Sequence, residues 1–132
     1  AESISFDGFT GPYCQYAYAR IFGILEKAGQ RGMEDGLADP ALLGNMEELL
    51  LLKMLIQFPE EVASGVAEYN PSRVAVHVFN TAKAFNQFYN KHAVLQAGSN
   101  ELTAARLALI KATAVMLKRG LNLLGIDVLE NM

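Results

Sequence analysis

Three tyrosines and an arginine stand close together near the start of this chain of 132 residues. Residues 10–21 read Thr-Gly-Pro-Tyr-Cys-Gln-Tyr-Ala-Tyr-Ala-Arg-Ile. In a helix, Tyr13 and Tyr16 share a face at a spacing of three, and Arg20 lies one turn beyond Tyr16 at a spacing of four. Phenol rings beside a guanidinium suit stacking on a flat ligand better than burial in a core. The pattern therefore indicates a binding surface.

Groups that could perform catalysis are not arranged for it. His77 and His92 have no metal-ligand partners at a useful spacing, and Cys14 has no base near it in the sequence. The adjacent acids at residues 47–48 and 60–61 would point in different directions around a helix. We therefore expect no catalytic residue and no metal site. We expect His77 on a helix surface or in a capping contact, and Cys14 as a small buried residue.

Charge is distributed unevenly along the chain, although the net charge is only −3. Residues 1–68 carry four basic and eleven acidic side chains, whereas residues 69–119 carry seven basic side chains and one acidic one. Such asymmetry indicates an electropositive face turned toward a polyanion. The alternative is that each half has its own solvated surface.

Composition predicts one globular all-α domain in the cytoplasm. Apolar residues make up 52% of the chain, with many Leu and Ala, and the length is enough to bury a full core. The single cysteine cannot form an internal disulfide, which favours a reducing compartment. The longest apolar stretch is far shorter than the roughly 20 residues of a membrane helix, so we expect no membrane association.

The spacing of apolar residues and the positions of proline and glycine predict a bundle of about five main helices. The expected spans are residues 12–28, 45–57, 59–69, 71–90 and 101–119. Proline fits the first helical position, so Pro59 is expected to separate the second helix from the third, and Gly120 to follow the last one. The leucine run at residues 49–52 predicts a central, buried second helix. Residues 29–39 contain three glycines and are expected to form a mobile loop.

Both ends of the chain resemble one known family. Residues 10–20 fit T-G-P-[FY]-x-Q-Y-x-x-[AS]-R, the pattern at the start of the C-terminal, anticodon-binding (DALR-type) domain of arginyl-tRNA synthetases. Residues 120–126, Gly-Leu-Asn-Leu-Leu-Gly-Ile, and Met132 are similar to the segment that closes that domain. The resemblance implies a single helical domain over residues 1–132, of the class I synthetase anticodon-binding type.

The resemblance also implies a ligand, the anticodon stem-loop of the tRNA for arginine. The family's aromatic positions fall on Tyr13, Tyr16 and Tyr89, and its closing methionine falls on Met132. Bases in a loop can be splayed out, stacked on rings and read at their edges. Arg20 is expected either to contact the RNA or to form a structural ion pair with an acid of the second or third helix.

Further side chains divide between RNA contact and the core. The expected phosphate contacts are Lys83, Lys91, Arg106 and Lys111. Amides for reading base edges are Asn86, Gln87 and Asn90. Helical spacing favours a core position for Phe85 and Phe88, whereas Tyr18 suits the core and the surface equally.

Synthetases of this class activate the amino acid with ATP and Mg²⁺ in a nucleotide-binding domain that carries H-[IV]-G-H-type and K-M-S-K-S-type signatures. Neither signature occurs in this sequence. The chain is therefore expected to be a fragment of an arginine–tRNA ligase, inactive alone and without a cofactor, whose catalytic domain lies upstream. The alternative is a helical protein-docking or dimerisation module, which the apolar content, the leucine run and the acidic first half would suit.

Overall fold

The computed structural model describes residues 10–33 and 38–132. It contains four α-helices, α1 (Thr10–Gln30), α2 (Met46–Ala67), α3 (Pro71–Lys91) and α4 (Asn100–Leu123), and a short 3₁₀ turn, η1 (Pro40–Leu42). These residues contain no strand, which confirms the all-α prediction. The prediction of about five main helices is wrong by one. The predicted loop at residues 29–39 includes residues 34–37, which lie outside the described residues.

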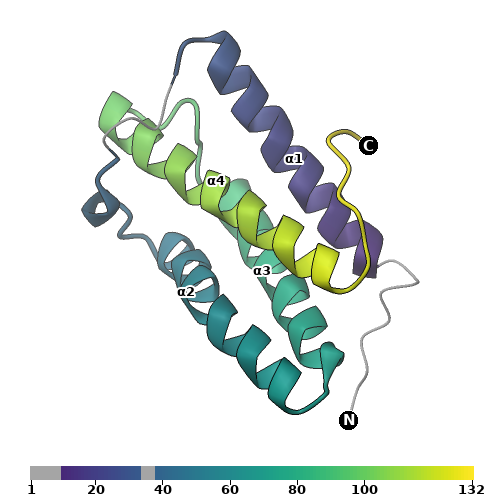
Figure 1. Ribbon diagram of the computed structural model, residues 1–132. Helices are drawn as coiled ribbons and strands as arrows, with labels where there is room; N and C mark the ends of the chain where they lie inside the picture. The colour runs from purple at the N-terminus through teal and green to yellow at the C-terminus, as the bar shows by residue number, and fades with distance from the viewer. Residues whose placement is uncertain (1–9, 34–37) are drawn as a thin grey trace.

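Helices α3 and α4 form the centre of the bundle (Figure 1). Helix α2 packs mainly against α3, whereas α1 packs against both α4 and α3. Within the described part of the chain, α1 and α2 do not pack against each other. The central pair therefore has to hold two outer helices that give each other little support.

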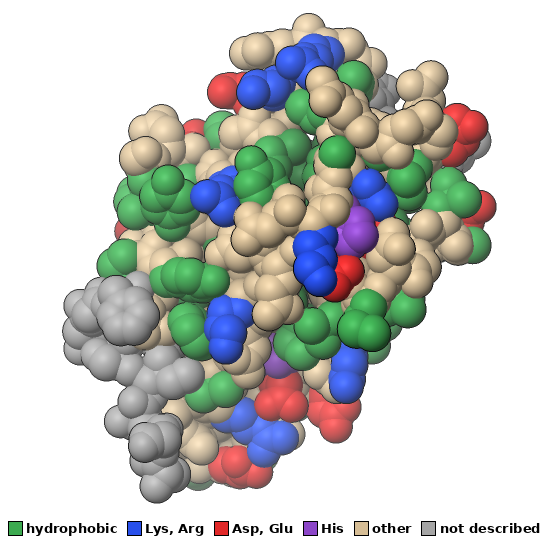
Figure 2. Space-filling model, turned by 180° about the vertical axis from the view of Figure 1, so that it is seen from behind, with side chains coloured by type: hydrophobic (Ala, Val, Ile, Leu, Met, Phe, Trp, Pro, Cys, Tyr) green, Lys and Arg blue, Asp and Glu red, His purple; other side chains and the backbone are tan. Residues whose placement is uncertain are grey.

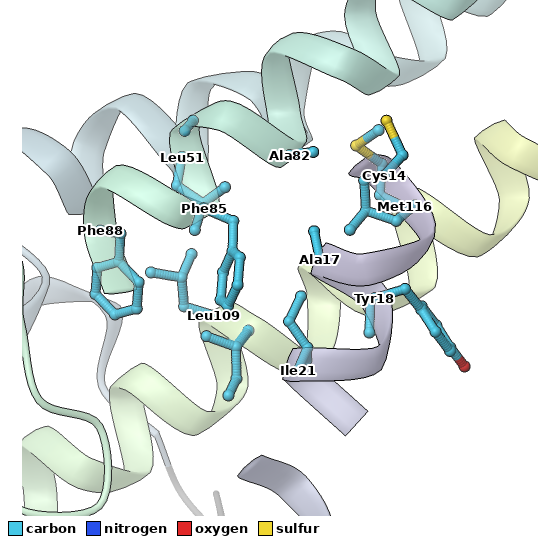
Figure 3. Close-up of a cluster of buried hydrophobic side chains, with 14 of the residues drawn as sticks. Cys14, Ala17, Tyr18, Ile21, Leu51, Ala82, Phe85, Phe88, Leu109 and Met116 are labelled. Atoms are coloured by element: carbon cyan, nitrogen blue, oxygen red, sulfur yellow. The ribbon is translucent and has the colours of Figure 1, made fainter. Parts of the chain in front are cut away.

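Side chains from all four helices meet in one hydrophobic core (Figure 3). The labelled members of that core are Cys14, Ala17, Tyr18, Ile21, Leu51, Ala82, Phe85, Phe88, Leu109 and Met116. The predicted burial of Cys14, Phe85 and Phe88 is confirmed, because none of the three is exposed. Tyr18 also belongs to the core, with 8% of its surface exposed, and its hydroxyl points away from the other labelled side chains.

Helix α2 runs unbroken through Pro59, so the prediction of two separate helices there is wrong. A proline inside a helix removes one backbone hydrogen bond and costs about 3 kcal/mol, which tertiary packing has to offset. His77 of α3 supplies part of that packing. Its Nε2–H donates to the carbonyl oxygen of Met54 at 2.7 Å, and its ring stacks on Phe58 with centroids 6.2 Å apart. His77 is therefore buried between two helices and not on a helix surface.

Helix α2 lies at the edge of the bundle, so the prediction of a central second helix is also wrong. Among the leucines at residues 49–52, only Leu51 is fully buried, and 52% of the surface of Leu49 is exposed. A helix with neighbours on one side can bury only one stripe of side chains. A run that is apolar all round therefore leaves some leucines in solvent.

Helix α4 continues through Gly120 to Leu123, so the prediction that Gly120 follows the last helix is wrong. Gly125 has a φ of 80°, and the backbone N–H of Ile126 donates to the carbonyl oxygen of Leu121 at 2.9 Å, as in a Schellman cap. Gly120 is buried inside α4, where a Cβ would clash with Cγ2 of Val78 on α3. The glycine is needed there for close helix packing and not for termination.

A buried ion pair joins α2 to α4. Nε of Arg106 donates to Oε2 of Glu48 at 2.8 Å, with the two side chains 7% and 0% exposed. Nη1 of Arg106 donates to the carbonyl oxygen of Ala93 at 2.7 Å, and the backbone N–H of Asn45 donates to Oε1 of Glu48 at 3.0 Å. Burial alone would raise the pKa of the Glu48 carboxyl. The hydrogen bonds from Arg106 and Asn45 and the charge of Arg106 outweigh that effect and hold the pKa below its ordinary 4.5.

Replacing Glu48 by glutamine should lower the free energy of unfolding by about 3 kcal/mol, because the buried guanidinium of Arg106 loses its counter-charge. Urea titration at pH 7 measures the loss. The pKa of Glu48 is lowered in the folded state, so its stabilisation is complete above about pH 4.5 and is lost as the pH falls below that value. The stabilities of wild type and Glu48→Gln should therefore converge in acid.

The control is Glu60→Gln, at an exposed position of the same helix, which should change stability by no more than about 0.5 kcal/mol. Equal stability of Glu48→Gln and wild type at pH 7 would contradict a structural role for the pair.

Replacing Gly120 by alanine should destabilise the domain by about 1–3 kcal/mol, because the added methyl group must push Val78 away from α4. Gly29→Ala is the matched control, since nothing lies within 4 Å of a Cβ built at Gly29 in α1. That variant should gain about 0.5 kcal/mol, because alanine restricts the unfolded chain more than glycine does. Thermal unfolding of both variants distinguishes the two glycines, and a stable Gly120→Ala would argue against the close approach.

Candidate nucleic-acid interface

Arg20 lies between two tyrosine rings that belong to different helices. Its guanidinium carbon is 5.5 Å from the ring centroid of Tyr16 on α1 and 4.7 Å from that of Tyr89 on α3. Cation–π attraction in this range contributes about 0.5–1 kcal/mol at exposed sites. Three residues predicted separately from the sequence therefore form one group, the Arg20 cluster (Tyr16, Arg20 and Tyr89). The ion pair considered as an alternative for Arg20 does not occur among the described residues.

Asn86 connects this cluster to Tyr13. Its Nδ2 donates to the hydroxyl oxygen of Tyr13 at 2.8 Å, and its Oδ1 accepts from Nη1 of Arg20 at 3.2 Å. The ring of Tyr13 is half-buried and lies 5.4 Å from that of Phe79. Tyr13 thus supports Arg20 through Asn86, and both ends of the Asn86 amide have partners within the protein.

The C-terminal segment folds back along α1 and brings Met132 to the same place (Figure 1). Ile126 and Val128 pack against the core, and Nε2 of Gln15 donates to the carbonyl oxygen of Asp127 at 2.8 Å. Met132 then lines a hollow of about 410 Å³, the Met132 pocket. Its other lining residues are Tyr16, Ala19, Arg20, Phe22, Gly23, Glu26, Glu130 and Asn131.

A second and larger hollow lies on the other side of Arg20. This α1 groove, of about 760 Å³, is bounded by α1, the end of α3 and the segment at residues 92–96. Three of its lining residues, Arg20, Lys27 and Arg31, are basic. Lys27 and Arg31 were not among the predicted contacts. Lys27 lies two turns from Arg20 on the same face of α1, a signal that was present in the sequence, and Arg31 follows directly after the helix.

The predicted phosphate contacts lie in different surroundings. Arg106 is buried against Glu48 and Ala93, so the prediction that it holds a phosphate is wrong. Lys91 is exposed, but its Nζ is 3.4 Å from Oε2 of Glu47. Lys83 is exposed, with its Nζ 5.4 Å from the ring centroid of Phe79, and Lys111 is exposed on α4. Figure 2 shows that basic side chains are scattered over the face turned away in Figure 1 and do not gather into one patch.

Glu47 fixes the wall of the α1 groove at His92. Nε2 of His92 lies 2.9 Å from Oε1 of Glu47, and the His92 ring stacks on Phe88 with centroids 5.7 Å apart. The hydrogen bond from His92, with further help from the backbone and Lys91, lowers the pKa of Glu47 to about 2. The carboxylate therefore stays charged at neutral pH and ties α2 to the end of α3.

The titratable side chains of the described residues offer neither a metal site nor a reactive thiol. No group of three or more His, Cys, Asp and Glu side chains there could hold a metal ion. Burial raises the pKa of the Cys14 thiol to about 12, so Cys14 is not a nucleophile near neutral pH. None of the described helices is long and apolar enough to cross a membrane. The arrangement offers binding chemistry, with rings and cations beside two hollows.

Comparison with known proteins agrees with this type of site. The profile of the DALR anticodon binding domain family matches residues 14–132. The chain belongs to this family. The match gives no support to the alternative of a protein-docking or dimerisation module.

Relatives of this DALR domain are arginine–tRNA ligases. Those of Clostridium kluyveri and Clostridium botulinum (strain Hall) are 42% and 45% identical to it over 131 residues, which is 99% of this chain and 23% of each relative. The structure of Thermus thermophilus arginyl-tRNA synthetase matches 97% of the domain and 22% of that enzyme at a TM-score of 0.85 and 36% identity. A putative arginyl-tRNA synthetase of Campylobacter jejuni matches 91% of the domain and 26% of its own chain, at a TM-score of 0.79 and 26% identity.

The thiol of Cys14 should be inert in the folded DALR domain, because it is buried and its pKa is raised to about 12. A thiol-specific chromogenic reagent at pH 8 should modify it slowly in buffer and rapidly in denaturing urea. The control is a small thiol compound of ordinary pKa, whose rate of modification is measured in buffer and in urea. Fast modification of the folded domain would show that the core around Cys14 is open.

Proposed function

We propose that this domain recognises the anticodon stem-loop of the tRNA for arginine, as the RNA-reading part of an arginine–tRNA ligase. The observation that carries the proposal is the Arg20 cluster, with the exposed ring of Tyr16 beside the Met132 pocket and that of Tyr89 beside the α1 groove. Membership of the DALR family and the identity of the relatives support it.

Recognition by the cluster would rest on stacking. Tyr16 and Tyr89 are 53% and 40% exposed, so each ring keeps surface for a base of the opened loop. Stacking of a base on an aromatic ring contributes about 1–3 kcal/mol. Met132, 60% exposed beside Tyr16 and Arg20, adds a flexible apolar contact that adapts to the edge of a base.

The hydrogen bonds behind the cluster would raise affinity by holding it in place before RNA arrives. Asn86 fixes the guanidinium of Arg20 and is itself fixed by Tyr13. Immobilising a long side chain on binding costs about 0.5–1.5 kcal/mol, and Arg20 has already lost part of that freedom. Tyr13 would thus act as a support for the binding surface.

Lysines outside the cluster would contact phosphates with unequal strength. Lys83 and Lys111 are exposed on neighbouring helices. Lys91 shares its charge with Glu47, so its contribution to RNA binding should be smaller than that of Lys83. Arg106 takes no part, because its charge is neutralised inside the bundle.

Ligase chemistry would belong to the rest of the enzyme. The chain spans 23% of the length of its curated relatives, and the nucleotide-binding signatures are missing from its sequence. In the full-length cytoplasmic enzyme, an upstream catalytic domain would use ATP and Mg²⁺ to attach arginine to the tRNA. This domain would contribute recognition of the RNA and no catalytic residue.

Titration of this chain with the anticodon stem-loop of an arginine tRNA tests the proposal. Affinity should exceed that for an unrelated anticodon loop, and its logarithm should fall with the logarithm of salt concentration by about 0.7 per phosphate neutralised. Tyr16→Ala should weaken binding by about 1–3 kcal/mol because the ring no longer stacks on a base, with little change in thermal stability.

Tyr69→Ala is the matched control, because Tyr69 is 93% exposed and lies between α2 and α3, away from the cluster. It should bind RNA like wild type. Equal binding to both loops, or equal loss of affinity in the two tyrosine variants, would refute the proposal. Unfolding of Tyr16→Ala would show instead that Tyr16 is a structural residue.

A further inference from the structure

The Met132 pocket and the α1 groove meet on the surface of α1. Arg20 and Gly23 line both hollows, so a ligand can pass from one to the other across Gly23. Arg20 stands at the same boundary, with Tyr16 on the side of the Met132 pocket and Tyr89 on the side of the α1 groove. The two hollows therefore form one path over the helix.

Gly23 is not required by the packing of the protein. It lies in the middle of α1, it is exposed, and no atom lies within 4 Å of a Cβ built at this position. Its φ is not among the positive ones. Glycine in a helix interior is destabilising, and glycine is typical of places where a ligand approaches the backbone closely. What glycine provides at position 23 is thus open space above the helix backbone.

The two ends of the path differ in charge. The α1 groove is lined by Arg20, Lys27 and Arg31, and no ion pair within the described residues engages Lys27 or Arg31. The Met132 pocket is lined by Glu26 and Glu130 besides Arg20. A strand crossing α1 would place its phosphates in the groove, because the carboxylates repel them from the pocket.

We propose that single-stranded RNA crosses α1 at Gly23 and that the α1 groove is a second nucleotide subsite. This rests on the proposed function. Lys27 and Arg31 neutralise the phosphates that enter the groove, while Ile24, Val94 and Leu95 offer apolar lining to a base or ribose. Arg20 separates the nucleotide in this subsite from the one in the Met132 pocket. Basic grooves that follow the backbone beside stacking rings are typical of single-strand binding.

The test is Gly23→Ala compared with Gly29→Ala. Both variants replace an exposed glycine of α1 that has nothing within 4 Å of a built Cβ, so both should raise the melting temperature slightly. Only Gly23→Ala places a methyl group in the proposed path. It should bind the arginine anticodon stem-loop about tenfold more weakly than wild type, a change of about 1.4 kcal/mol, whereas Gly29→Ala should bind like wild type.

A second measurement tests the phosphate contacts in the α1 groove. Lys27→Gln combined with Arg31→Gln should reduce the salt dependence of binding by about 0.7 for each phosphate that the variant no longer neutralises. Lys53→Gln on α2, an exposed lysine outside both hollows, should leave the salt dependence unchanged. If Tyr16→Ala weakens binding but Gly23→Ala and the double variant do not, this inference is overturned and the proposed function stands. If the wild-type domain binds the arginine anticodon stem-loop no more tightly than an unrelated anticodon loop, the proposed function fails and this inference fails with it.

Discussion

The bundle depends on the buried ion pair between Glu48 and Arg106. Helices α1 and α2 do not pack against each other among the described residues, so each must be attached to the central pair separately. The ion pair attaches α2 to α4, and the same guanidinium holds the carbonyl oxygen of Ala93. A buried pair has weak solvent screening, and removing one partner leaves a bare charge in the core. Because Ala93 lies in the wall of the α1 groove, this ion pair also shapes the proposed RNA surface.

Helix α1 serves two purposes on two faces. Cys14, Ala17 and Ile21 enter the core, while Tyr16 and Arg20 face the hollows. The cluster is completed from α3, through Tyr89 and Asn86, so its geometry depends on how α1 packs against α3. A site shared by two packed helices is more rigid than a site on a loop. Such rigidity would favour the RNA recognition that we propose for this domain.

Sequence reasoning succeeded where the signal is local. The burial of Phe85 and Phe88 follows from the helical spacing of neighbours in the chain. Sequence reasoning failed where a residue far away in the sequence determines the local structure or the burial of a side chain. Pro59 stays helical because α3 packs on that turn. Gly120 leaves the space that Val78 of α3 occupies. Arg106 looked like a surface cation because Glu48, its partner, is 58 positions away.

The burial of the single cysteine makes this domain easy to label. Since the sequence holds no other thiol and Cys14 is sealed in the core, a cysteine introduced on the solvent side of α1 would be the one attachment point for a fluorophore. Position 26 is exposed at the rim of the Met132 pocket. A dye there would report the arrival of a nucleotide through its emission, with both tyrosines of the cluster left intact. Because the core excludes water from Cys14, that thiol would stay unlabelled, and the fluorescence would come from the opposite face of the helix alone.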